Sequence, residues 1–280
     1  MGDKKWKRVR WIGIYGIFFL VVFVACLFWR FPSQIFKEVV SARVGDLHPA
    51  LSLFIKDMAP EFPLALRLEK TELRFNKLAE SNLEADSIRI YPDVGRLFEG
   101  RTDLDLDIRA YGGRASGTVG YDGILSVRAP FKGDVKFENM ATQNIACLKH
   151  ILGRQVFGKL KGSISYGRKT KESAGAGRLD FNIQNGSYPL QGKIMGIEKL
   201  DFTQLEGQLV MAEKSIKIEY INMNGEKIRC TVKGEVTIDP ADFRNSQINM
   251  TGNLELKAMN NQKVVFSVTG TLMNPITKVG

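Results

Sequence analysis

Cysteine and histidine, the residues behind most disulfide frameworks and transition-metal sites, are scarce in this chain. Its 280 residues include three cysteines and two histidines. Three cysteines are too few for a disulfide framework. Cys26 lies in an apolar run, and the sequence leaves open whether Cys147 and Cys230 form a disulfide. Neither His48 nor His150 has cysteine or carboxylate neighbours at ligand spacing, so we expect no metal site.

Catalytic motifs are missing as well. The chain has no Gly-x-Ser-x-Gly elbow, no Walker loop and no His-Glu-x-x-His. The Gly-rich stretch from Gly112 to Gly117 superficially resembles a dinucleotide loop, but it joins two predicted strands rather than a strand and a helix. Asp103, Asp105 and Asp107 alternate along a strand toward solvent and lack the glycine and terminal glutamate of a calcium loop. We therefore expect no enzyme, no cofactor and no catalytic residues.

Positive charge is in excess but thinly spread. The net charge is +10, of which five basic residues and one acid among the first ten residues supply +4 and the rest of the chain +6. Outside the first ten residues no dense cluster of Lys and Arg is interleaved with aromatic residues. The charge therefore predicts a solvated basic surface and no nucleic-acid partner.

One long uncharged segment is present near the start of the chain. Nineteen residues from Trp11 to Trp29 lack any charge and lie between Arg10 and Arg30. A helix of that length reaches about 28 Å, close to the roughly 30 Å of bilayer hydrocarbon. A cleaved signal peptide is the alternative, but the run is longer than an h-region and no small-x-small site follows it. We predict a transmembrane helix over 11–29, with the basic residues 1–10 cytoplasmic.

Residues 30–63 are predicted to form a helical connector next to the membrane. Ser33 suits the N-cap of a helix. Four apolar residues then fall on one helical face: Ile35, Phe36, Val39 and Val40. The apolar stretch from Leu51 to Met58 is expected to be helical too.

From Leu64 onward the apolar period changes to two, which is typical of strands with one wet face. Leu104, Leu106 and Ile108 alternate with the aspartates named above. Gly112-Gly113, Asn185-Gly186 and Asn224-Gly225 supply the turns that short hairpins require. Residues 64–280 are therefore predicted to be a mainly β domain: a long, curved, largely antiparallel sheet of around a dozen strands. Short helices are expected only at Asp93–Phe98 and at Thr142–Leu152, which ends at Gly153.

An alternating apolar face of this length must contact something: a second sheet, a helix or an apolar ligand. The candidate lining residues of that face are Leu104, Leu106, Ile108, Ile216, Ile218, Val232 and Val236. A packed core and a lipid groove require the same residue types, so the sequence leaves both alternatives open.

Three stretches carry a resemblance to a known family. They are the apolar run leading into Phe31-Pro32, the strand-turn-strand Ala110–Gly117, and a C-terminal series of β-turn patterns that includes Phe202–Leu209, Val232–Val236 and Thr269–Pro275. In this order they resemble the type II secretion system protein N family, which is itself similar to AsmA-like periplasmic proteins. The resemblance covers nearly the whole chain.

The resemblance implies a periplasmic β-rich domain anchored in the inner membrane by one helix. Its partners would be the proteins of the type II secretion system, in which it would act in assembly or interaction. The AsmA-like proteins imply an alternative, in which the apolar face of a curved sheet binds phospholipid acyl chains and carries lipid between the inner and outer membranes. No catalytic residue comes with either.

Overall fold

The computed structural model describes residues 11, 15–16, 18–19, 22–23, 26, 30–62 except 48–50, 64–75, 82–121, 131–168, 175–194, 197–212, 214–239, 242, 245–257 and 262–279. These residues form one antiparallel sheet of 14 strands with a few short helices. The prediction of a mainly β, largely antiparallel fold is confirmed.

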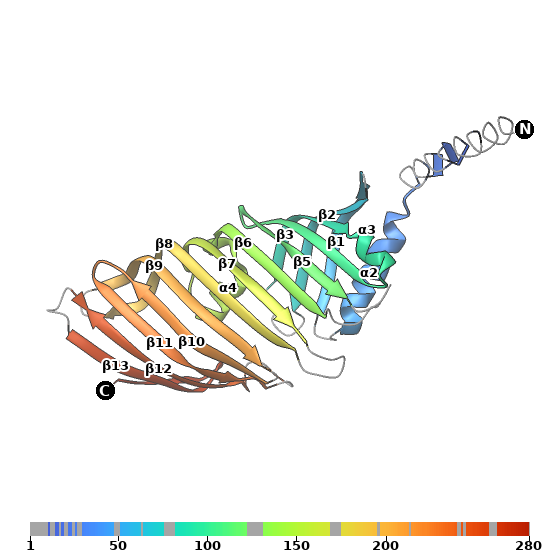
Figure 1. The fold of residues 1–280 in the computed structure, drawn as a ribbon. Helices are drawn as coiled ribbons and strands as arrows, with labels where there is room; N and C mark the ends of the chain where they lie inside the picture. Colours follow the sequence, from blue (N-terminus) through green and yellow to red (C-terminus); the bar gives the residue numbers. More distant parts are fainter. Residues whose placement is uncertain are drawn as a thin grey trace, which may run out of the picture.

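The strands lie side by side in chain order, from β1 at one end of the sheet to β14 at the other (Figure 1). Their bounds are β1 (Leu51–Glu61), β2 (Ala65–Phe75), β3 (Leu83–Pro92), β4 (Thr102–Ala110), β5 (Gly113–Tyr121), β6 (Lys132–Ala141), β7 (Phe157–Gly167), β8 (Ala176–Ile194), β9 (Ile197–Ala212), β10 (Ser215–Asn224), β11 (Ile228–Thr237), β12 (Gln247–Leu256), β13 (Gln262–Thr271) and β14 (Pro275–Val279).

Four short helical segments accompany the sheet: α2 (Ser33–Leu47), α3 (Val94–Phe98), the 3-10 helix η1 (Thr142–Asn144) and α4 (Ala146–Leu152). The helical turns expected at Asp93–Phe98 and Thr142–Leu152 are confirmed. Gly153 follows α4 with a φ of 69°, the left-handed conformation that glycine adopts most easily at a helix C-terminus.

The sheet is a single layer over most of its length. Each strand contacts chiefly the strands before and after it, and among the helices only α2 lies extensively against a strand, β1. Figure 1 shows α2 at the β1 end and the C-terminal strands at the opposite end. Within the described residues, no second sheet packs against the first.

The helix expected from Leu51 to Met58 is wrong. These residues belong to β1, which pairs with β2 from Leu51 opposite Phe75 to Glu61 opposite Ala65. Leu51, Leu53 and Ile55 alternate with other residues at a period of two, and short apolar runs are ambiguous between helix and strand. The connector predicted over 30–63 is therefore one helix followed by the first strand of the sheet.

The three predicted turns have different outcomes. The first turn is confirmed but displaced by one residue: Tyr111 and Gly112 have φ angles of 54° and 73°, and Gly113 already pairs with Ala110. The second is wrong, because Asn185, with a φ of 49°, distorts β8 without ending it and Gly186 pairs with Phe202 of β9. The third is confirmed, since Gly225 N–H donates to the Ile228 carbonyl between β10 and β11.

The predicted cytoplasmic tail 1–10 and most of the apolar run 11–29 lie outside the described residues. The described members of that run, from Trp11 to Cys26, are helical and exposed. In the part of the chain that the structure describes, we find no helix with the length and apolar character needed to cross a bilayer.

Candidate functional site: an uncovered apolar face

Backbone pairing aligns the inward side chains of successive strands into rows that cross the sheet, and we call the surface they form the apolar face. One row runs through Ile88, Ile108, Ala115, Phe137, Gly162, Phe181, Gly207, Ile221, Val232, Gly252 and Phe266. The next runs through Ile90, Leu106, Gly117, Val135, Ile164, Leu179, Leu209, Ile218, Gly234, Met250 and Val268. A third begins at Leu104 and passes Ile216, Val236 and Ile248.

All seven candidate lining residues lie on this face. Ile108 and Val232 share the first row and Leu106 and Ile218 the second, while the third contains Leu104, Ile216 and Val236. Ile218 is buried and the other six are half-buried. The predicted alternation is therefore continuous from β4 to β11, and the seven residues belong to one surface.

The apolar face remains open to solvent in the middle of the sheet. Ile164 on β7 is 47% exposed, although Val135 and Leu179 flank it on both neighbouring strands. Met211 on β9 is 39% exposed. A side chain in the interior of a two-layer core would be almost fully buried. Around Ile164 and Met211 the described residues therefore leave the apolar face open, whereas Phe137 and Ile218 on the same rows are each 7% exposed.

The floor of this surface contains aromatic rings that lie over glycines of the neighbouring strand. A Cβ atom built on Gly162 would lie 2.7 Å from the ring of Phe137, and one on Gly207 would lie 2.6 Å from the ring of Phe181. The same relation joins Gly252 to Phe266, at 2.3 Å. Because each ring occupies the space of an absent side chain, it lies along the sheet instead of projecting from it.

At the β1 end, α2 covers the apolar face. Ile55, Met58 and Leu68 are 6%, 4% and 3% exposed. Phe31, which precedes α2, and Val40 on α2 pack against these three. Lys37 of α2 also donates a hydrogen bond from Nζ to the Lys56 carbonyl and lies 3.6 Å from the Asp57 carboxylate. α2 therefore closes one end of the face.

The segment from η1 to α4 packs at the strand ends next to β7. Thr142 is 1% exposed, and its hydroxyl donates to the carbonyl oxygens of Val156, at 2.9 Å, and Gly158, at 3.1 Å. Val156 is buried with Ile183 and Phe202. Tyr188 Oη donates to the Leu152 carbonyl at 2.9 Å, which ties α4 to β8.

A cavity of about 800 Å³ lies where the β8–β9 hairpin extends past its neighbours. Leu200, Phe202 and Ile228 give it an apolar lining. Five charged residues also line it: Glu198, Lys199, Asp201, Glu226 and Lys227. Lys199 and Asp201 form an exposed ion pair at 3.1 Å. The cavity therefore combines an apolar wall with both signs of charge.

The opposite face of the sheet is polar and carries ion pairs. Asp107 of the predicted solvent-facing trio accepts a hydrogen bond from Arg114 Nε at 2.7 Å. Arg178 Nε donates to Asp180 at 2.8 Å, and this bond, together with one from Gln208, holds the Asp180 pKa below its usual value. In the described part of the chain, no group of three His, Cys, Asp or Glu is placed to hold a metal ion.

The cysteines do not form a disulfide. Cys147 on α4 and Cys230 on β11 are both free and half-buried. Burial raises the pKa of both thiols, so both are protonated at neutral pH.

No protein-family model matches this chain, and neither a curated protein nor a solved structure matches it. The resemblance to the type II secretion system protein N family and to AsmA-like proteins stays a prediction.

Sequence reasoning missed the alternation of phenylalanine and glycine along one row, the role of α2 as a cover and the charged cavity. Within each strand, the phenylalanine or glycine occupies one of the alternating inward positions, which the sequence shows. Their pairing depends on the register between strands, which the sequence pattern leaves undetermined.

Proposed function

We propose that this protein is a membrane-tethered groove that binds lipid acyl chains, the role that AsmA-like proteins imply. The observation that carries the proposal is the exposure of Ile164 in the middle of the apolar face, 47%, with strands on both sides and, among the described residues, no second layer above it. Fully burying one Ile or Leu side chain contributes about 1.5–3 kcal/mol. A face with many such side chains half-exposed therefore gains substantially from an apolar ligand.

An acyl chain fits this surface better than a folded partner does. It is unbranched and flexible, so it can follow a row of side chains across a twisted sheet. The phenylalanine rings that lie over Gly162, Gly207 and Gly252 project little from the sheet along one such row. Fourteen strands at about 4.8 Å spacing span roughly 62 Å, whereas one leaflet of hydrocarbon is about 15 Å thick. The face has room for several chains in series.

In this proposal the run 11–29 crosses the inner membrane, residues 1–10 are cytoplasmic and residues 30–280 are periplasmic. The support is the nineteen-residue uncharged run and the basic residues that precede it. Alkaline phosphatase fused after Gly280 should be active in cells, because its disulfides form only outside the cytoplasm. A fusion that is produced in normal amounts but inactive would reject this topology.

Photo-crosslinking in living cells tests the groove. A benzophenone amino acid replaces Ile164 in the full chain, and the matched control replaces Ser163, its neighbour on the polar face opposite Lys136 and Asp180. We expect the probe at position 164 to crosslink phospholipid, detected by ³²P labelling and mass spectrometry, and the probe at 163 to crosslink none. Equal labelling at the two positions, or crosslinks from 164 only to protein, would reject the groove.

A second candidate function is a component of the type II secretion system that acts in its assembly. The feature that favours it is the open edge of β14, where Ile276 and Val279 are 56% and 69% exposed. An edge strand can accept a strand from a partner protein. Affinity purification from native membranes should then recover secretin-complex proteins, and their loss on replacing Thr277 with proline would locate the contact at β14. Recovery of none of these proteins would exclude this function.

A further inference from the structure

We propose that the α2 end of the sheet lies in the membrane interface and contacts the bilayer directly. The contact surface, here called the end patch, consists of Ile35, Phe36, Val39, Phe62, Leu64 and Phe98. This inference rests on the tethering in the proposed function and is independent of the groove.

The side chains of the end patch are unusually exposed for large apolar residues. On α2, Ile35 is 62%, Phe36 43% and Val39 50% exposed, although Val40 next to them packs against the sheet. Phe62 and Leu64, between β1 and β2, are 80% and 58% exposed. Single exposed apolar residues are ordinary, but a group of them marks an interaction surface.

Strand register places these residues at one end of the molecule. Glu61 pairs with Ala65 and Leu66 pairs with Ile90, so the β1–β2 connection lies at the edge of the sheet where β1 and β3 end and β2 begins. α3 follows β3 at that edge and carries Phe98, which is 89% exposed. The N-terminal part of α2 lies toward the same edge, because its residue Lys37 contacts Lys56 and Asp57 in the second half of β1. Figure 1 shows α2 and α3 at this end.

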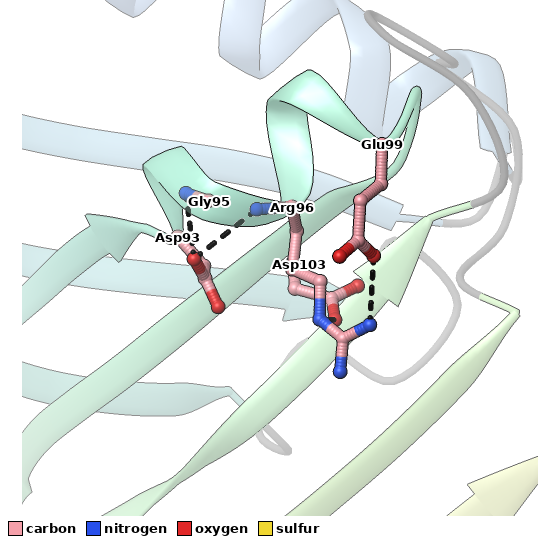
Figure 2. Close-up of polar contacts among 5 residues, drawn as sticks. All are labelled: Asp93, Gly95, Arg96, Glu99 and Asp103. Atoms are coloured by element: carbon pink, nitrogen blue, oxygen red, sulfur yellow. Dashed lines mark hydrogen bonds and ion pairs between the residues drawn. The ribbon is translucent and has the colours of Figure 1, made fainter.

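The exposure of Phe98 is built into a well-fixed element. Asp93 caps α3 by accepting hydrogen bonds from the backbone N–H groups of Gly95, at 2.9 Å, and Arg96, at 3.3 Å (Figure 2). Arg96 lies between two carboxylates, at 2.9 Å from Glu99 and 3.7 Å from Asp103. The α3 turn is therefore held against β4, and Phe98 at its end stays exposed.

The position of the apolar run identifies the bilayer as the occupant. That run ends at Trp29, four residues before α2 begins at Ser33. A tether this short holds the first turns of α2 within about 10–15 Å of the run. The described residues of the run are themselves exposed, with Trp11 at 57% and Phe19 at 71%. Arg30 and Arg101, both exposed, adjoin the patch and suit anionic headgroups.

Depth measurements on the full chain in lipid vesicles test the contact. In a background of Cys26→Ala, Cys147→Ala and Cys230→Ala, a fluorescent probe is attached at Phe36→Cys, Phe62→Cys or Phe98→Cys. The matched control is Met273→Cys, whose exposure, 62%, lies between those of Phe36 and Phe62 but which lies next to β14. Brominated phosphatidylcholine should quench the three patch probes several-fold more than the control, and aqueous iodide should show the reverse order.

Each other outcome would overturn the inference. If the chain floats with vesicles but the three probes behave like the control, the end patch lies away from the bilayer while the tether stands. If patch probes in native membranes are shielded from iodide and also from brominated lipid, a protein covers the patch. If the chain does not float, the tether fails together with the patch. Lipid crosslinking at position 164 reports the groove separately.

Discussion

Two regions of the apolar face, the β1 end and the middle of the sheet, have the same residue pattern and different surroundings. At the β1 end, α2 covers Ile55, Met58 and Leu68, and all three are less than 7% exposed. In the middle of the sheet the rows continue with residues of the same kind, but Ile164 and Met211 remain 47% and 39% exposed, although Ile218 nearby is 7% exposed. Alternation along the strands thus defines which side chains share a face, and what packs over each position decides whether it is buried.

The largest expected difference between the two regions is the loss of free energy of unfolding when an apolar side chain is truncated. Leu68→Ala removes a buried side chain and should lower the free energy of unfolding by about 2–5 kcal/mol. Ile164→Ala removes a half-exposed one and should cost about 1 kcal/mol or less. Urea denaturation followed by circular dichroism measures both. Equal losses would mean that the face is covered in both regions.

Weakening the contact of α2 with the sheet should expose the apolar face at the β1 end as well. Val40→Asp places a carboxylate against Ile55, Met58 and Leu68 and should weaken the contact of α2 by about 1–3 kcal/mol. Hydrogen-exchange mass spectrometry should then show faster exchange in β1 and β2. The matched control is Ile35→Asp on the outer side of α2, which should leave that exchange unchanged. Faster exchange in the control alone would contradict the placement of Val40.

The contact between the Phe181 ring and Gly207 can be tested by adding one methyl group at Gly207. Gly207→Ala places a Cβ about where the ring of Phe181 lies, and the ring must lift from the sheet at a cost of about 1–3 kcal/mol. Gly167→Ala on β7 is the control, because nothing lies within 4 Å of its Cβ position. Thermal unfolding should separate the two variants, and identical melting temperatures would show that the ring does not occupy that space.

The smallest expected effect concerns the polar face, where the two regions should behave alike. The hydrogen bond from Arg74 lowers the pKa of Glu72 at the β1 end, and that from Arg178 lowers the pKa of Asp180 in the middle of the sheet. A lowered pKa in the folded state contributes stability above the unfolded pKa, and this contribution is lost as the pH falls through the folded value. We expect Arg74→Gln and Arg178→Gln to reduce the acid sensitivity of the urea midpoint slightly and equally, since both pairs are exposed.

The sequence predicted most of the sheet because long stretches of the strands after β2 have a period of two, although register shifts interrupt some pairings. It also placed all seven lining residues on one face, since alternation alone assigns Leu104, Leu106 and Ile108 to the same side. β1 was missed because its apolar run is short, and Asn185-Gly186 was misread because a local distortion of a strand and a hairpin turn use the same residues.

What the sequence left undetermined is the contact of the apolar face. Ile164 and Leu68 have the same local pattern, and their burial differs because α2 reaches only the first strands. The rings over Gly162 and Gly207 likewise depend on which strand positions are opposite each other. Strand register and packing between residues far apart in the chain determine both, and neither can be read from a short stretch of sequence.

The strictly sequential order of the strands has a consequence for how such a protein can change over evolution. Because each strand pairs only with its neighbours in the chain, duplicating or deleting one hairpin alters the span by about 10 Å and leaves every other pairing intact. The length of the sheet is therefore set by the number of hairpins and can change while the two end strands stay the same.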